Sequence, residues 1–194
     1  MGSATLLPMR FFVYALCLFL SAAAQPAHAG AQKAGAASLD DLFIQLKRSA
    51  NESAANRIAR SITGRLEESG SATIDLLMLK ASEAMAEGEN DVALDLLDQV
   101  IMLDPAFAEG WNRRATLHFK MRNFNKSVAD IHAVLEREPR HFGALAGLAA
   151  IFMATGREES ALAVYERVLV IYPMMRDAQR AVGTLADKLA GEGI

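Results

Sequence analysis

Three histidines, His118, His132 and His141, have the most versatile chemistry beyond residue 30, because imidazole transfers protons and ligates metals near neutral pH. None of them lies in an H-E-x-x-H sequence or near a cysteine, which are the usual zinc-binding patterns. His132 and Glu136 lie four residues apart and could share one helix face, but two ligands are too few for a stable metal site. We interpret this pair as a solvated surface contact and predict no bound metal.

No motif in the sequence supplies a catalytic nucleophile or a phosphate-binding loop. The one cysteine, Cys17, lies within the first twenty residues, and the adjacent acids Glu67-Glu68 and Glu158-Glu159 fall on expected helix surfaces or helix starts. We therefore predict a protein that is not an enzyme and uses no cofactor. A cell-wall hydrolase stays as an alternative, although nothing positions a nucleophile or a metal for that reaction.

The composition indicates a folded protein whose partner is another protein. Of the 194 residues 52% are hydrophobic, and 20 Lys and Arg stand against 23 Asp and Glu. These values exclude fibrous, disordered and disulfide-scaffold classes. A formal net charge of -3 provides no excess of basic side chains for nucleic acid. We expect a protein or peptide partner, and neither nucleic acid nor a small-molecule substrate.

The first thirty residues have the order of a secretory signal peptide. Arg10 precedes ten apolar residues, 11–20, and a short region of small and polar residues ends at the triplet Ala27–Ala29. This order predicts a signal peptide over residues 1–29, cleavage after Ala29 and a periplasmic protein. The alternative is an uncleaved inner-membrane anchor facing the periplasm, because Leu6–Ala24 could span a bilayer if tilted. Only that alternative brings the chain into contact with a membrane.

A sequence repeat organises the rest of the chain. Pro105, Pro139 and Pro173 are evenly spaced, and their spacing divides the sequence into the units 74–107, 108–141 and 142–175. In each unit the apolar positions form two runs at helical spacing, so each unit predicts a helical hairpin. The other repeating places hold Ala81, Ala115 and Ala149; Ala93, Ser127 and Ala161; Leu77, Trp111 and Leu145; Leu97, Ile131 and Tyr165; and Val100, Val134 and Val168.

These residues resemble the tetratricopeptide repeat family, which has small, aromatic and proline residues at these places. The last unit matches well, including Gly156 and Tyr165, whereas Lys80, Arg114 and Arg122 depart from the pattern in the first two units. The resemblance implies an all-α fold, a right-handed superhelical stack of helical hairpins. It also implies a small secreted protein of Gram-negative, alphaproteobacterial type.

Both flanks of the three repeats show weaker patterns. Residues 39–73 read as a degenerate first hairpin, in which Ser71 replaces the proline and Ser38 with Asp41 predicts a capping box. Residues 30–38 are rich in Ala and Gly and predict a flexible leader. Residues 176–194 predict a closing helix with a polar outer face, as a repeat stack needs for solubility.

The first helix of each unit is expected to line the concave side of the stack. The second place of this surface reads Asp41, Asp75, Glu109 and Gly143, so that an acid recurs in three successive units. These acids could stabilise the helix starts through the macrodipole, or they could form an acidic rim that selects basic segments.

The twelfth place of the repeat carries large flexible side chains. It reads Asn51, Met85, Phe119 and Met153, with Ile44 and Met78 farther back on the same stripe. The stripe could pack between repeats, or it could bind apolar ligands that Met side chains can adapt to.

Two further features of the first helices allow two interpretations each. Asn112 and Arg113 hint at a clamp for a carboxylate, but the neighbouring repeats lack matching basic residues. Gly143 and Gly147 leave a bare strip, which serves either close packing of a neighbouring helix or close approach of a partner.

We therefore predict a non-catalytic periplasmic adaptor of the cell envelope that binds a partner peptide or helix in the concave groove. The alternative is a periplasmic holdase for an apo-protein or an outer-membrane precursor, which would bind promiscuously through Met and Phe side chains. The predicted groove residues are Ile44, Asp75, Met78, Met85, Glu109, Asn112, Arg113, Phe119 and Met153.

Overall fold

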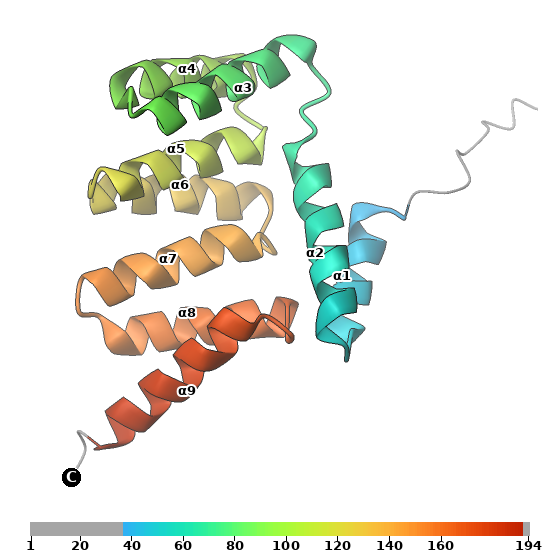
Figure 1. Ribbon diagram of the computed structural model, residues 1–194, viewed down its shortest axis with the longest axis vertical. Coiled ribbons are helices and arrows are strands. Elements are labelled where there is room, and N and C mark those ends of the chain that lie inside the picture. Colours follow the sequence, from blue (N-terminus) through green and yellow to red (C-terminus); the bar gives the residue numbers. More distant parts are fainter. Residues whose placement is uncertain (1–36, 192–194) are drawn as a thin grey trace, which may run out of the picture. The chain divides into compact units, whose positions relative to one another are not determined.

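A computed structural model describes residues 37–191, and these residues form nine α-helices and no strand (Figure 1). Figure 1 shows the helices as antiparallel pairs laid side by side. The helices are α1 Leu39–Arg48, α2 Glu52–Glu67, α3 Ala72–Glu87, α4 Asn90–Leu103, α5 Ala108–Lys120, α6 Phe124–Arg137, α7 Phe142–Ala154, α8 Glu158–Ile171 and α9 Arg176–Gly191.

The three predicted repeats form the stack, so the all-α hairpin fold is confirmed. Each hairpin packs internally as α3 with α4, α5 with α6 and α7 with α8, and α9 closes the stack against α8. The small residues that recur in the repeat lie where paired helices approach each other, and large apolar residues fill the remaining space. The buried members are Ala81, Ala93, Ala115, Ala149, Ala161, Leu97, Leu145, Ile131, Val100, Val134 and Val168.

The repeat-defining prolines lie in the short linkers between hairpins. Helices α4, α6 and α8 each end two positions before a proline, and the next helix begins three positions after it. Proline ends each helix because it removes a backbone donor and restricts the preceding residue. The turns inside the hairpins use a left-handed residue, with φ 82° at Gly88, 62° at Arg122 and 71° at Gly156.

The predicted first hairpin forms as α1 and α2, with the predicted capping box of Ser38 and Asp41. It does not extend the stack by packing on α3 and α4. Instead, α1 contacts α8 and α2 contacts α5, and both helices run across the axes of the stacked helices (Figure 1). The linker explains part of this difference, because it contains no proline and Gly70 has φ 74°.

The outer surface of α3 explains the rest of the difference. In α5, Leu117 is fully buried and packs with residues of α3 and α4. The same place in α3 is Glu83, whose carboxylate receives a hydrogen bond of 2.8 Å from Lys80. A hairpin stacked on α3 would have to bury this ion pair, which is costly.

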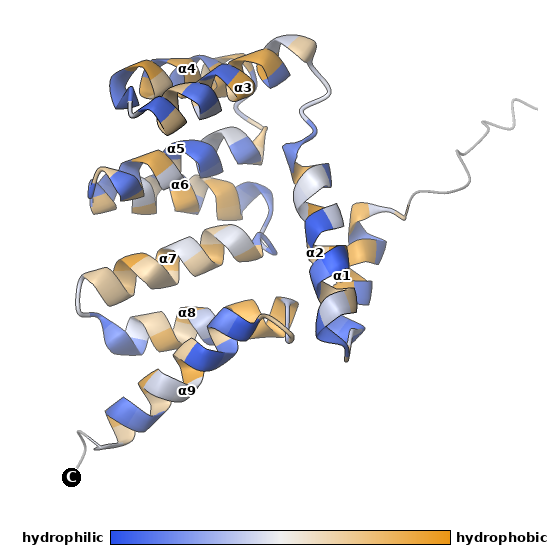
Figure 2. Ribbon diagram, viewed as in Figure 1, coloured by the Kyte–Doolittle hydropathy of each residue, from blue (hydrophilic) through white to orange (hydrophobic). Residues whose placement is uncertain are grey.

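The outer end of the stack therefore stays uncovered. Several large apolar side chains are exposed on α3 and α4, including Leu76, Leu79 and Met102, and Figure 2 shows hydrophobic segments in both helices. Within residues 37–191, no helix combines the length and hydropathy that a membrane span requires.

Candidate functional site

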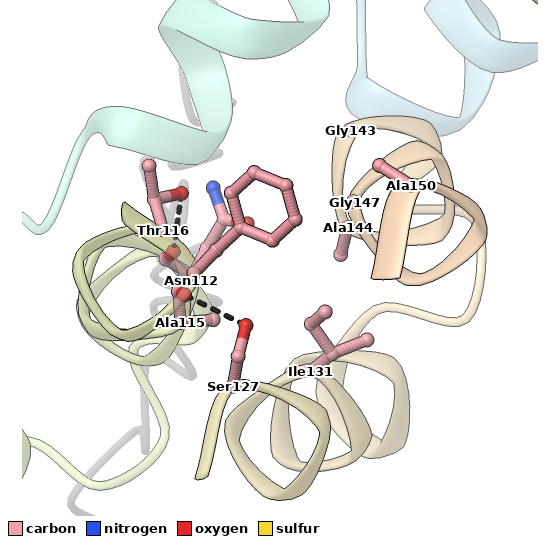
Figure 3. Close-up of a pocket in the computed structure, with 10 residues that line it drawn as sticks. Asn112, Ala115, Thr116, Ser127, Ile131, Gly143, Ala144, Gly147 and Ala150 are labelled. Carbon is pink, nitrogen blue, oxygen red and sulfur yellow. Dashed lines mark hydrogen bonds between the residues drawn. The ribbon is translucent and has the colours of Figure 1, made fainter. Parts of the chain in front are cut away.

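A pocket of about 160 Å³ opens between α5, α6 and α7. Figure 3 shows Asn112 and Thr116 on one wall, Gly143, Gly147 and Ala150 on the facing wall, and Ser127 and Ile131 at the base. The lining residues are Asn112, Ala115, Thr116, Phe119, Ser127, Ile131, Gly143, Ala144, Gly147 and Ala150.

The repeat geometry creates this pocket. The fifth, ninth and twelfth places of the first helix in the second repeat put Asn112, Thr116 and Phe119 on one side, as predicted for the concave surface. In the third repeat, the residues that face them across the pocket are only glycine and alanine. Large side chains on one helix and small ones on the next leave the space between the two helices open.

The glycine strip on α7 is not required by packing inside the chain. A Cβ atom added at Gly147 would meet only Ile131 Cδ1, at 3.8 Å, and one at Gly143 would meet only the His141 ring, at 3.4 Å. Gly110 of α5 has the opposite environment, because its Cβ would lie 2.8 Å from Val100 Cγ1. The close helix packing considered for Gly143 and Gly147 therefore occurs at Gly110, which the sequence reasoning did not single out.

The polar groups around the pocket already have partners. The Ser127 hydroxyl donates a hydrogen bond of 2.8 Å to the carbonyl of Ala115 at the base. On the wall, Thr116 donates to the carbonyl of Asn112, and the Asn112 amide donates to Glu109 Oε2 at 2.9 Å. The surface that remains is apolar, so the pocket is suited to an apolar side chain of a ligand.

Glu109 lies beside the pocket and is only 5% exposed. Its carboxylate accepts hydrogen bonds from Asn112 and Arg113, and His141 Nε2 lies 3.4 Å from Glu109 Oε2. Burial alone would raise the pKa of Glu109, but the bond and charge of His141, together with Arg113 and Asn112, lower it. Glu109 is therefore a buried structural carboxylate.

His141 sets the start of α7, which forms one wall of the pocket. Its Nδ1 accepts the backbone N–H of Ala144 at 3.0 Å and so caps the helix. The other ring nitrogen, Nε2, faces the Glu109 carboxylate, 3.4 Å from Oε2. The Glu109–His141 pair thus links the ends of α5 and α7.

A second, more polar pocket of about 380 Å³ lies between α3, α5 and the end of α2. It brings together three predicted groove residues, Asp75, Met78 and Arg113, with Glu67, Leu79 and Ser82. The Arg113 guanidinium donates to Ser82 Oγ at 2.8 Å and to Glu109 Oε1 at 3.3 Å, and it lies 3.5 Å from Glu67 Oε1. A carboxylate of the chain itself therefore lies beside this cation.

The remaining predicted groove residues lie elsewhere. Ile44 borders a pocket between α1, α8 and Arg140. Met85 packs against a buried cluster formed by α3, α4 and Leu117 of α5. Met153 is 42% exposed and lines neither of the pockets that hold the other groove residues.

The acids at the second place of the repeat make contacts within the chain. Asp41 accepts hydrogen bonds in the capping box of α1, Asp75 accepts the hydroxyl of Ser69, and Glu109 is buried. These contacts favour the structural interpretation of the acidic ladder.

A charged cluster, which the sequence reasoning did not identify, connects α4, α5 and α6. Arg114 donates two hydrogen bonds to Asp130, at 2.7 and 2.9 Å, and one to Asp98 at 2.6 Å. Nearby His118 is 6% exposed and its Nδ1 has no hydrogen-bond partner. The ion pair of Arg114 and Asp130 could have been predicted from the sequence. Arg114 occupies a repeat position that is normally apolar, and the oppositely charged Asp130 lies in the second helix of the same repeat.

Burial lowers the pKa of His118, and the charges of Arg114 and Lys126 add to this effect while Asp130 opposes it. His118 is therefore a buried imidazole whose neutral form is favoured, and it lies beside the Arg114–Asp130 ion pair. Across residues 37–191, no group of three His, Cys, Asp or Glu side chains is arranged to hold a metal ion.

Comparisons with known proteins agree with this geometry. The tetratricopeptide repeat family model matches residues 112–174. A TPR repeat-containing protein of Rhizobium etli is 53% identical over 153 residues, covering 79% of this chain and 75% of the relative. That relative agrees with the alphaproteobacterial type suggested by the sequence.

Solved structures show the same fold. The first TPR of Spaghetti (RPAP3) bound to the HSP90 peptide SRMEEVD has a TM-score of 0.57 and 23% identity, covering 62% of this chain and 95% of that chain. The MamA protein has a TM-score of 0.54 and 15% identity, covering 77% of this chain and 79% of that chain. The chain therefore belongs to the tetratricopeptide repeat family, whose stacked hairpins form scaffolds for protein–protein interaction.

Proposed function

We propose that this protein is a non-catalytic periplasmic adaptor of the cell envelope that binds an apolar segment of a partner protein in the pocket between α5 and α7. The observation that carries the proposal is the bare wall of α7, where Gly143 and Gly147 line the pocket and an added Cβ would meet only the His141 ring or Ile131, at 3.4 Å or more. A glycine inside a helix costs up to about 1 kcal/mol relative to alanine. Two glycines in α7 therefore lower the stability of the helix but leave the apolar pocket open, which is consistent with a ligand-binding role.

The size of the pocket indicates what the partner inserts. Its volume of about 160 Å³ is similar to that of an apolar cavity of ~150 Å³ that takes up benzene. One aromatic or branched aliphatic side chain of the partner would fill it. Each square ångström of apolar surface buried there contributes roughly 25 cal/mol.

Two structural relatives support a peptide as the partner. The TPR of Spaghetti (RPAP3) is bound to an HSP90 peptide, and TPR2B of yeast Sti1 forms a complex with pHsp70. The promiscuous alternative through Met and Phe side chains receives less support. Met85 packs against a buried cluster formed by its own repeat and Leu117 of the next, and the Phe119 ring packs against Phe124 at 5.7 Å between centroids.

The periplasmic part of the proposal depends on the amino-terminal sequence, which lies outside the described residues. A protein cleaved after Ala29 would begin at Gly30. Mass spectrometry of the protein isolated from its native envelope should find this amino terminus. An intact Met1 or Met9 would overturn release into the periplasm and favour the membrane-anchored alternative.

The binding part is tested by blocking the pocket. Peptides are first selected on the purified protein from a random phage-displayed library, and the dissociation constant of the tightest peptide is measured by calorimetry. We expect Gly147→Leu to fill the pocket and weaken this peptide about tenfold or more, which corresponds to losing about two methylene groups of burial. Gly183→Leu is the matched control, because Gly183 also lies in a helix and faces open space. Equal affinities of both variants and the unchanged protein would overturn the assignment of the pocket.

A further inference from the structure

We propose that the hairpin of α1 and α2 is a displaceable element, which leaves the stack as one unit while the three repeats stay folded. This proposal rests on the proposed function, because release of the hairpin would change access to the groove. The contacts that hold the hairpin to the stack differ from those between the repeats.

The apolar packing of the hairpin is largely its own. Phe43, Leu46 and Ile62 are buried in a cluster that contains one buried residue of the stack, Tyr172, and the partly buried Phe142, Ile171, Met174 and Met175 of the stack pack against it. The stacked repeats from α5 to α8 instead share one continuous cluster. The contacts of α1 with α8 and of α2 with α5 are also less extensive than those between neighbouring repeats. A unit with its own small core and a smaller contact with its neighbour is expected to open at lower free energy than that neighbour.

The hairpin is held at its periphery by three ion pairs, each with a different arginine of the stack. Asp40 lies 2.7 Å from Arg140, Glu52 lies 2.6 Å from Arg176, and Glu67 lies 3.5 Å from Arg113. The six side chains are 26–77% exposed, so salt screens these pairs and each contributes little. Docking of the hairpin should therefore weaken as the ionic strength rises.

Two aromatic contacts define the surface on which the hairpin docks. The Arg140 guanidinium lies 4.2 Å from the ring centroid of Phe43, and the Tyr172 hydroxyl forms a hydrogen bond with Asn56. The Tyr172 ring also packs edge-on against Phe142, with centroids 5.5 Å apart. These residues belong to the ends and linkers of the repeats, so the stack keeps its own core when the hairpin leaves.

The hairpin is coupled to the groove through the last turn of α2. Glu67 lines the polar pocket between α3 and α5 and lies beside Arg113. Arg113 is the basic residue among those that line this pocket. When the hairpin leaves, this pocket loses a wall and Arg113 loses a partner, so the groove becomes wider and more positive.

The linker permits this motion. Residues 68–71 contain serine and glycine where the linkers between stacked repeats carry proline, and Gly70 has φ 74°. Such a linker does not fix the direction of the chain as proline does.

Hydrogen exchange measured by mass spectrometry tests the opening itself. The test variant combines Asp40→Asn, Glu52→Gln and Glu67→Gln, which remove the three ion pairs without changing side-chain size. We expect amides of residues 39–67 to exchange about tenfold faster in the variant, with exchange in α5 to α8 unchanged. Raising the NaCl concentration from about 0.05 M to about 0.5 M should accelerate exchange of the hairpin in the unchanged protein. Equal acceleration in hairpin and stack, or none in either, would overturn the proposal.

The control variant is Glu68→Gln, whose partner Arg65 belongs to α2 itself, so no contact with the stack is removed. Its exchange should match that of the unchanged protein, and a hairpin that opened equally in this variant would refute the role of the pairs with the stack.

Affinity for the phage-selected peptide tests the coupling to the groove. A hairpin that restricts the groove lowers the apparent affinity, so the double variant of Asp40→Asn and Glu52→Gln, which keeps the pocket-lining Glu67, should bind this peptide several-fold more tightly than the unchanged protein. Equal or weaker binding would overturn the coupling. Failure of the proposed function is recognised separately, because Gly147→Leu would then leave peptide affinity unchanged whatever the hairpin does.

Discussion

Replacing Gly147 with alanine gives the sharpest stability test of the open pocket. The added Cβ would lie 3.8 Å from Ile131 Cδ1, an ordinary van der Waals distance, with no other atom within 4 Å. The variant therefore gains the helix propensity of alanine without strain, and the free energy of unfolding should rise by about 0.5–1 kcal/mol. Urea unfolding followed by circular dichroism measures the change. A loss of stability would refute the reasoning, because it would mean that neighbouring atoms fill the space beside Gly147.

Gly110→Ala is the matched comparison, since the same change is made in the neighbouring first helix. Its Cβ would lie 2.8 Å from Val100 Cγ1, and Val100 is fully buried. Overpacking typically costs about 1–3 kcal/mol, which is larger than the gain in helix propensity of up to about 1 kcal/mol. We expect the free energy of unfolding to fall by about 1 kcal/mol. Equal effects at Gly110 and Gly147 would show that their different surroundings do not govern stability.

Three other predictions concern residues outside the pocket. Arg122→Gly should raise the free energy of unfolding by about 0.5–1 kcal/mol in urea unfolding, because Arg122 is non-glycine at φ 62°; a loss of stability would show that its side-chain contacts outweigh the strain. Asp130→Ala should cost about 3 kcal/mol in the same assay, because it leaves the Arg114 guanidinium without its buried partner; a cost below about 1 kcal/mol would contradict this account. The lowered pKa of His118 means that the unfolded chain takes up a proton below pH ~6.5 while the folded chain takes it up only at lower pH, so the free energy of unfolding should decrease as the pH falls from 7 to 5. His118→Gln should flatten this part of the pH dependence, and a slope that survives His118→Gln would exclude His118 as its cause.

The fold could be predicted because the repeat period and the helix period both appear in the sequence. Evenly spaced prolines mark the linkers, and small residues such as Ala81 and Ala149 mark where helices approach. These signals are local, so each repeat predicts its own hairpin. The position of the first hairpin is not local, because it depends on whether α3 offers a surface for stacking.

That position was nevertheless marked in the sequence. Glu83 occupies the repeat position at which the other two repeats bury Leu117 and Ile151. The linker that contains Gly70 lacks the proline of the other linkers between repeats. The matching places of Phe43 and Leu46 favoured a stacked hairpin, but both residues are buried in a separate cluster beside Tyr172. Apolar periodicity predicts that a face is buried and does not identify the surface that buries it.

The candidate site was predictable only in part for the same reason. The positions of Asn112 and Phe119 within the repeat predicted that both residues face the groove, and both line the pocket between α5 and α7. The environment of each glycine could not be read from the sequence, because the distance from its Cβ to the next side chain depends on how the helices pack. Gly110 was therefore not predicted to be a packing glycine, although an added Cβ there would lie closer to a neighbouring atom than at any other described glycine.

The central claim is that the groove between α5 and α7 receives a partner segment, and NMR titration of the isotope-labelled protein with the phage-selected peptide tests it most directly. We expect the largest chemical-shift changes at Thr116, Gly143, Gly147 and Ala150, which line the pocket. Changes concentrated instead at the exposed end of the stack, at Leu76, Leu79 and Met102, would contradict it.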